Sequence, residues 1–122
     1  MIMHKQVEYK GMMIDEKILP LVKLLNENGI ETSYSCEGDQ EHMPYILLPA
    51  SDETDKFIKN LLYFDFMCRD IKMKNKKDGV HLSSNFHVEY DCELGYLRYC
   101  IRCTNLEEMI HKIEAIFDNN LV

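Results

Sequence analysis

The stretch that decides the fold is Gly29-Ile-Glu-Thr-Ser-Tyr-Ser-Cys-Glu-Gly-Asp39. Gly29 is typical of the residue that follows a helix, because glycine adopts left-handed backbone at little cost. Residues 30–36 alternate in character, which is the period of a β-strand. The strand runs into Ser35-Cys36-Glu37-Gly38-Asp39, a tight loop that places a thiol, carboxylates and backbone N–H groups at a sheet end. Ligands commonly bind at strand ends, so this loop is the first candidate site.

The residues before this stretch predict a strand and a helix. Residues 6–10 are expected to form a short edge strand, and residues 15–28 a helix that Gly29 ends. Pro20 lies close enough to the helix start to be tolerated. The apolar side chains that recur at helical spacing are Ile14, Ile18, Leu21, Val22 and Leu25.

The residues after the loop predict four further strands and two helices. Residues 44–49 read as a buried strand between two prolines, and Ser51 is a cap for a second helix. Residues 70–74 are expected to be a strand that leads to a hairpin turn at 76–79. Residues 80–90 and 96–103 alternate like strands, and Thr104 with Glu107 forms a capping box that opens a last helix.

Together these elements predict an α+β fold of a single domain, residues 1–122. The expected layout is two layers, with a largely antiparallel sheet of about five strands and three helices on one face. The chain contains no linker, internal repeat or low-complexity tract that would divide it.

The composition is that of an ordinary globular protein, with 46% hydrophobic and 29% charged residues among 122. No apolar run is long enough to span a bilayer, and the N-terminus lacks a secretory core, so we expect a cytoplasmic protein without a membrane partner. The five cysteines are an odd number without scaffold spacing, which favours free thiols. A net charge of −7 argues against broad nucleic-acid binding. Exposed sheet edges in a domain of this size favour a homo-oligomer.

The loop at residues 35–39 has the features of an anion site. Successive N–H groups around a glycine curl into a nest for anions, and Gly38 removes the side chain that would block a ligand. Glu37 and Asp39 favour instead a metal, a ribose hydroxyl or an amino group. The alternative is a plain turn in which Cys36 is buried as a small apolar side chain.

A second group of polar residues follows the last two strands. In a hairpin that turns near residues 93–95, His87 and Glu89 are expected to lie near Arg98 and Arg102 on one sheet surface. Arginines that point the same way suit a phosphate or carboxylate. The alternative is a solvated face with cross-strand Glu–Arg pairs, each contributing under about 1 kcal/mol.

Metal and thiol chemistry have little support in the spacing of residues. Cys100 and Cys103 have a zinc-like separation, but an odd offset in a strand sends the two thiols to opposite faces. His42, His81, His87 and Cys36 assemble only if tertiary contacts bring them together. The sequence therefore predicts no metal, cofactor or catalytic residue.

The segment from residue 15 to about residue 48 resembles the opening of small bacterial and bacteriophage proteins of unassigned function. That group has a short helix with an early proline, then Gly-hydrophobic-x-Thr, then Ser-Cys-x-Gly followed by His or Asp; here Asp39 takes the last position. The resemblance implies that Thr32, Ser35, Cys36 and Gly38 form a site. It implies nothing about a substrate.

These observations favour a non-enzymatic binding module for a small anionic ligand, such as a nucleotide or nucleotide-derived signal, in a phage-type sequestering role. Its expected ligand-binding residues are Thr32, Ser35, Cys36, Glu37, Gly38, Asp39, His87, Arg98 and Arg102. One alternative is a small hydrolase that uses a metal at Glu37 and Asp39, or Cys36 as nucleophile. Another is a protein–protein interaction domain.

Overall fold

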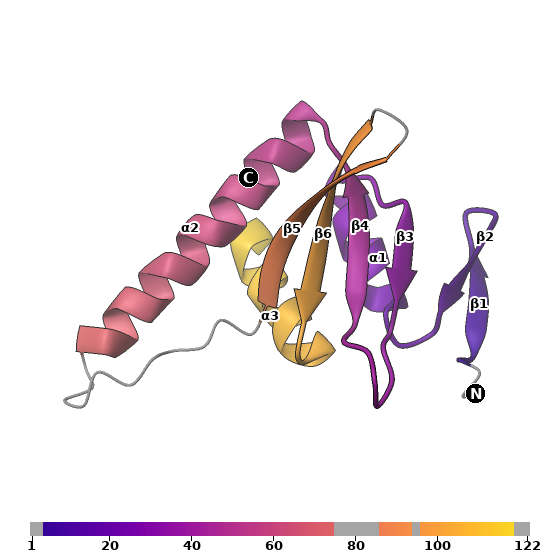
Figure 1. Cartoon of the computed structure of the whole chain (residues 1–122), viewed down its shortest axis with the longest axis horizontal. Coiled ribbons are helices and arrows are strands. Elements are labelled where there is room, and N and C mark those ends of the chain that lie inside the picture. The colour runs from indigo at the N-terminus through magenta and orange to yellow at the C-terminus, as the bar shows by residue number, and fades with distance from the viewer. Residues whose placement is uncertain (1–3, 75–85, 94–95, 119–122) are drawn as a thin grey trace.

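The computed structural model describes residues 4–74, 86–93 and 96–118. That part of the chain holds nine helices and strands, shown in Figure 1. In chain order they are β1 (Gln6–Tyr9), β2 (Met12–Asp15), α1 (Leu19–Glu27), β3 (Tyr34–Cys36), β4 (Tyr45–Pro49), α2 (Asp52–Lys74), β5 (Phe86–Glu93), β6 (Tyr96–Cys103) and α3 (Leu106–Asp118).

The strands form two antiparallel sheets, so the α+β class is confirmed while the single sheet of five strands is wrong. The larger sheet has the order β3-β4-β6-β5, and β1 pairs with β2 alone. The split arises at Lys10 and Gly11, which both have left-handed backbone with φ of 51° and 81°. Two such residues make a tight hairpin turn, so β1 finds its partner locally in β2. Figure 1 shows this hairpin standing beside β3.

Two predicted boundaries were wrong. Residues 12–15 form β2, and α1 begins only at Leu19, with Pro20 in its first turn. Residues 70–74, predicted as a strand, belong to α2, because a short alternating run fits either period and extending a helix costs less than starting a new element. The predicted turn at 76–79 lies outside the described residues.

Other predictions are confirmed. Gly29 follows α1 with a φ of 83°, and the N–H of Ile30 donates to the carbonyl of Leu25 across the helix end. The hydroxyl of Ser51 accepts a hydrogen bond from the N–H of Thr54 at the start of α2. β1, β4 and β6 lie where the sequence placed them. α3 also forms, but it begins at Leu106 and its cap is the side chain of Asn105, which accepts from the N–H of Glu108, instead of the predicted Thr104.

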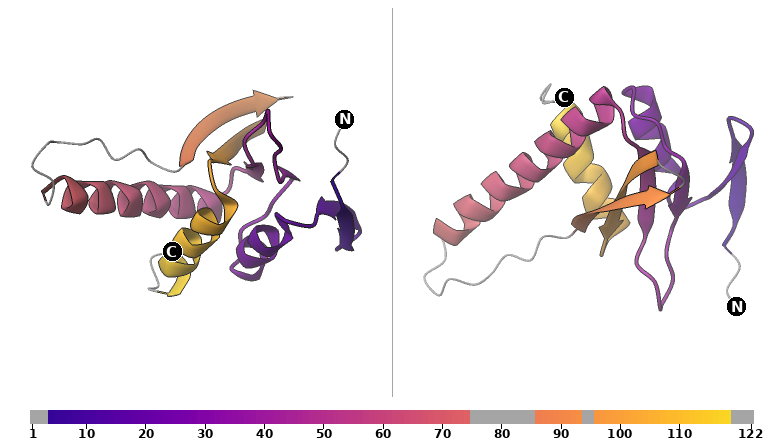
Figure 2. Two further views of the ribbon diagram at one scale, coloured as in Figure 1. Left: turned by 90° about the horizontal axis from the view of Figure 1, so that it is seen from below. Right: turned by 45° about the horizontal axis from the view of Figure 1, so that its top comes forward.

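The core lies between the larger sheet and the helices, which Figure 2 shows on the same side of that sheet. Phe57 of α2 and Phe117 of α3 stack with ring centroids 5.5 Å apart, and Tyr99 of β6 donates a hydrogen bond to Asp55 of α2. The largest fully buried side chains are Phe57, Ile18, Leu21, Leu25, Ile30, Ile46, Leu48, Leu61, Ile101, Met109, Ile113 and Ile116.

The opposite face of the larger sheet carries several polar and aromatic side chains. Cys36 of β3 lies opposite Tyr45 of β4, and Tyr45 lies opposite Arg102 of β6. Since directly opposed residues share a face, these three form one row across the sheet. Cys36 is at its end, next to the β1–β2 hairpin. No helix in the described part of the chain combines the length and apolar character of a membrane span.

Candidate functional site

Three side chains with different chemistry converge where the β1–β2 hairpin meets the end of β3. A ring nitrogen of His4, a carboxylate oxygen of Asp15 and the sulfur of Cys36 all lie within 4.8 Å of one another. His4 precedes β1 and Asp15 ends β2, so the hairpin brings them together, and Cys36 comes from the last position of β3. We call these three residues the corner cluster.

Asp15 is the best-buried member of the corner cluster, with 5% of its surface exposed. Its carboxylate accepts hydrogen bonds from Nδ1 of His4 at 3.0 Å, Nε2 of Gln6 at 2.9 Å and the N–H of Glu37 at 3.1 Å. Burial alone pushes the pKa of Asp15 up, but these hydrogen bonds from Gln6, Glu37 and His4 outweigh burial and lower the pKa. Asp15 is therefore a carboxylate at neutral pH, held in one orientation.

The loop after β3 holds the sulfur in place. The N–H of Gly38 donates to Sγ of Cys36 at 3.5 Å. Gly38 has a φ of 80°, and a Cβ there would lie 2.7 Å from the nitrogen of Pro44 and 2.8 Å from the carbonyl oxygen of His42. Only glycine fits this position, so the tight loop depends on Gly38.

The backbone donors of this loop are engaged within the protein, which the sequence did not anticipate. The N–H groups of Glu37 and Gly38 donate to Asp15 and Cys36, and the N–H of Asp39 donates to the carbonyl of His42 at 2.9 Å. The side chain of Asp39 accepts from the N–H groups of Glu41 and His42, and these bonds, that of Glu41 foremost, lower its pKa. The N–H groups of the predicted anion nest therefore donate to acceptors within the protein.

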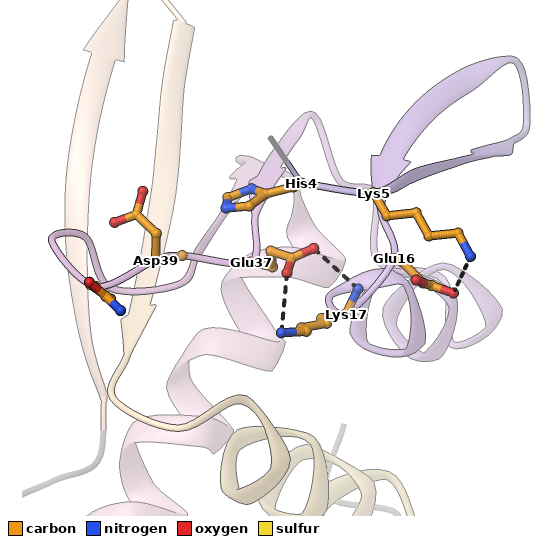
Figure 3. Close-up of a pocket in the computed structure, with 8 residues that line it drawn as sticks. His4, Lys5, Glu16, Lys17, Glu37 and Asp39 are labelled. Carbon is orange, nitrogen blue, oxygen red and sulfur yellow. Dashed lines mark hydrogen bonds and ion pairs between the residues drawn. The ribbon is translucent and has the colours of Figure 1, made fainter. Parts of the chain in front are cut away.

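A pocket of about 400 Å³ opens beside the corner cluster. Figure 3 shows its lining side chains, which come from the segment before β1, the segment after β2 and the loop after β3. Two ion pairs lie at its rim, Lys5 with Glu16 at 3.6 Å and Lys17 with Glu37 at 3.9 Å. The lining residues are His4, Lys5, Glu16, Lys17, Glu37, Gly38, Asp39 and Gln40.

His4 belongs to both the corner cluster and the pocket wall. Its side chain is 17% exposed, and its Nδ1 is engaged by Asp15. Its Nε2 is buried and has no hydrogen-bond partner among residues 4–74, 86–93 and 96–118. A buried polar atom without a partner is costly, so the imidazole is a group that a ligand would satisfy.

The structure separates the predicted site residues of β3 and its flanking segments among the pocket, the corner cluster and a second hollow. Glu37, Gly38 and Asp39 line the pocket and Cys36 lies in the corner cluster. Thr32 and Ser35 line a separate hollow of about 70 Å³ beside Met12 and Met13 of β2.

The arginines do not line the pocket. Arg102 places its guanidinium 5.1 Å from the ring centroid of Tyr45 and pairs with Glu89 at 3.5 Å. Arg98 lies four residues away along β6, opposite Pro49. His87 pairs with Arg102 in the sheet, and its side chain lies outside the described atoms. The pocket that the loop lines therefore does not include the two guanidinium groups.

Two members of the corner cluster, His4 and Asp15, were missed from the sequence. Asp15 was assigned to the start of a helix, and His4 was treated only as part of the N-terminus. The available signal was Lys10-Gly11, a hairpin turn between alternating segments, which sets Gln6 opposite Asp15 and brings His4 to the same end.

Comparison of the chain with protein-family models, with curated proteins and with solved structures finds no match. The resemblance to small bacterial and bacteriophage proteins therefore stays a prediction. The corner cluster and its pocket are the basis for the function proposed below.

Proposed function

We propose that this chain is a metal-dependent protein that binds a divalent transition metal, best Zn²⁺, through His4, Asp15 and Cys36. The observation that carries the proposal is the convergence of nitrogen, oxygen and sulfur ligand atoms within 4.8 Å. Zn²⁺ takes imidazole nitrogen, carboxylate oxygen and thiolate sulfur as ligands. Three protein ligands leave one position of a tetrahedral ion open, and the pocket that His4 lines is the space beside it.

The spacing favours a metal over a Cys–His–Asp catalytic triad. In a triad the imidazole separates the nucleophile from the carboxylate, so sulfur and carboxylate lie on opposite sides of the ring. In the corner cluster the sulfur and carboxylate oxygen are themselves within 4.8 Å of each other. Ligand atoms bonded to one Zn²⁺ at about 2.0–2.3 Å lie roughly 3.3–3.8 Å apart in a tetrahedron. On metal binding, the three side chains would have to rotate to bring their ligand atoms to that spacing.

The surroundings of the cluster match those of a metal site. Ligand side chains in such sites are held by further hydrogen bonds. Here Gln6 and the N–H of Glu37 hold Asp15, and the N–H of Gly38 is directed at the sulfur of Cys36. The N–H of Gly38 thus fixes the position of the sulfur, as further hydrogen bonds do for other metal ligands.

Zinc affinity tests the proposal directly. By competition with a chromophoric chelator, the wild-type chain is expected to bind one Zn²⁺, and His4→Gln and Cys36→Ser to bind about 100-fold more weakly or worse. Gln6→Ala, which removes only a hydrogen bond to Asp15, is expected to lose about 10-fold. His42→Gln and Cys103→Ala are the matched controls for an exposed imidazole and a buried thiol. Equal affinity in Cys36→Ser and wild type would overturn the proposal.

Thiol alkylation gives an independent readout. Iodoacetamide at pH 8 is expected to label half-buried Cys36 in chelator-treated protein, and Zn²⁺ is expected to protect it. Burial raises the pKa of Cys103 to about 11, so this thiol stays protonated at pH 8 and is expected to resist labelling with or without Zn²⁺. Peptide mass spectrometry separates the two sites. Labelling of Cys36 at the same rate with and without Zn²⁺ would count against it as a ligand.

A metal-dependent hydrolase is the second candidate, and Glu37 is the observation that favours it. Its carboxylate lines the same pocket, its side chain is 7% exposed, and it is not one of the three proposed ligands. A carboxylate in such a place serves as general base toward water. Glu37→Gln is then expected to abolish zinc-dependent hydrolysis of p-nitrophenyl acetate or phosphate and to leave zinc affinity within a few-fold. Unchanged hydrolysis in Glu37→Gln would exclude this role.

A further inference from the structure

We propose that the metal makes the pocket accept a small oxyanion, a phosphate or carboxylate group, which binds as the fourth ligand of the ion, whereas the metal-free pocket excludes it. The inference rests on the proposed metal site and names the class of ligand that this site takes. It also gives the predicted anionic ligand a physical basis other than the backbone nest.

The charges around the metal-free pocket oppose an anion. Its wall carries the carboxylates of Glu16, Glu37 and Asp39 against the ammonium groups of Lys5 and Lys17. Asp15 lies behind the wall and adds a fourth, buried carboxylate, which accepts a hydrogen bond from the N–H of Glu37. Carboxylates thus outnumber ammonium groups by two. In a partly buried site such an excess repels an anion and attracts a cation, so the first occupant must be positive.

The backbone donors of the loop that lines the pocket are already engaged within the protein. The N–H groups of residues 37–39 donate to Asp15, Cys36 and the carbonyl of His42. An oxyanion would therefore have to break these bonds or find a different positive partner. A divalent ion at the corner cluster supplies that partner at the inner end of the pocket.

The lysines at the rim complete the arrangement. Lys5 and Lys17 are 75% and 80% exposed, and their ion pairs are long, at 3.6 Å and 3.9 Å. The Lys5–Glu16 pair is exposed on both sides and contributes little, so the Lys5 ammonium group can turn toward a ligand at small cost. Lys17 is itself exposed, although its partner Glu37 is 7% exposed. Figure 3 shows both lysines on the side of the pocket formed by the segment after β2 and the segment before β1.

The size of the pocket limits the ligand to a small molecule. A volume of about 400 Å³ lies within the range of small-ligand pockets, and a net charge of −7 disfavours a long polyanion. The structure therefore points to the acidic group of a metabolite-sized molecule, with the metal on its inner side and lysines on its outer side.

The visible spectrum of the Co²⁺-loaded chain tests the inference, because cobalt bound to thiolate reports its own coordination. Inorganic phosphate and acetate are the two probes, and they separate a phosphate site from a carboxylate site. At least one is expected to shift the cobalt bands saturably at millimolar concentration. Isothermal calorimetry of the metal-free chain with the same anion is expected to show no binding. Lys5→Gln/Lys17→Gln is expected to weaken the anion several-fold and to leave the anion-free cobalt spectrum unchanged; Lys59→Gln on α2 is the matched control.

The outcomes separate the two proposals. A thiolate–cobalt spectrum that neither phosphate nor acetate alters would overturn this inference and leave the metal site standing. Equal anion affinity in the metal-free and metal-loaded chains would also overturn it. If no thiolate–cobalt spectrum forms at all, the metal site fails and this inference fails with it.

Discussion

The corner cluster and a second polar group, formed by Arg102, Glu89 and Tyr45 and called here the Arg102 group, differ sharply in burial. The loop that supplies Cys36 was predicted to share one site with Arg102, whereas His4 and Asp15 were not predicted. In the corner cluster, Asp15 is 5% exposed and receives three hydrogen bonds from different segments. In the Arg102 group, Arg102 and Glu89 are 36% and 49% exposed at the side chain and lie 3.5 Å apart. Burying polar groups costs free energy unless they are paired, whereas exposed pairs are nearly neutral. We therefore place the proposed metal site at the buried convergence, whereas the exposed pair is typical of a solvated surface.

The largest expected effect concerns the loop that supports the corner cluster. Gly38→Ala places a Cβ within 2.8 Å of backbone atoms at a φ of 80° and is expected to cost about 3 kcal/mol or more of unfolding free energy. Gly29→Ala is the matched control, because its φ is 83° and a Cβ there meets nothing within 4 Å. It is expected to cost about 1–2 kcal/mol. Urea unfolding measures both; equal losses would show that backbone conformation alone matters at Gly38.

An intermediate effect is expected when the buried carboxylate is removed. Asp15→Ala leaves Gln6, His4 and the N–H of Glu37 without their acceptor, and it is expected to cost about 2–3 kcal/mol in the metal-free chain. Urea unfolding in the presence of chelator measures the loss. A loss below 0.5 kcal/mol, on the order expected for an exposed position, would show that the corner is not a stabilised network.

The smallest effect is expected at the Arg102 group. Arg102→Gln removes the pair with Glu89 and the contact with the Tyr45 ring, and it is expected to cost about 1 kcal/mol or less. Zinc affinity, measured by the same chelator competition, is expected to be unchanged. A 10-fold reduction of zinc affinity in Arg102→Gln would show that Arg102 contributes to the metal site, and would contradict the separation of the two regions.

The strongly patterned elements could be predicted from the sequence because each carries its own local signal. The alternation in β6 places Tyr99, Ile101 and Cys103 in the core, and Gly29 ends α1 as expected. In the predicted loop, Glu37, Gly38 and Asp39 line the pocket and Cys36 lies beside it.

The corner cluster could not be predicted in the same way, because it is a tertiary contact. Asp15 is 21 residues from Cys36 in the chain, and its carboxylate accepts a hydrogen bond from the N–H of Glu37 in the loop. The helical spacing of Ile14 and Ile18 assigned Asp15 to a helix, although both isoleucines are core residues that precede α1. Predicting whether Arg98 and Arg102 lie beside the loop requires the order of the strands in the sheet. That order places β4 between β3 and β6, and no local sequence pattern reveals it.

X-ray absorption at the zinc edge of the Zn²⁺-loaded chain tests the central claim most directly, because it counts the atoms bound to the metal. We predict one sulfur at about 2.3 Å and two or three nitrogen or oxygen atoms at about 2.0–2.2 Å, with the sulfur lost in Cys36→Ser. A wild-type spectrum with only nitrogen and oxygen ligands, or a sulfur shell that survives in Cys36→Ser, would contradict the metal centre at His4, Asp15 and Cys36.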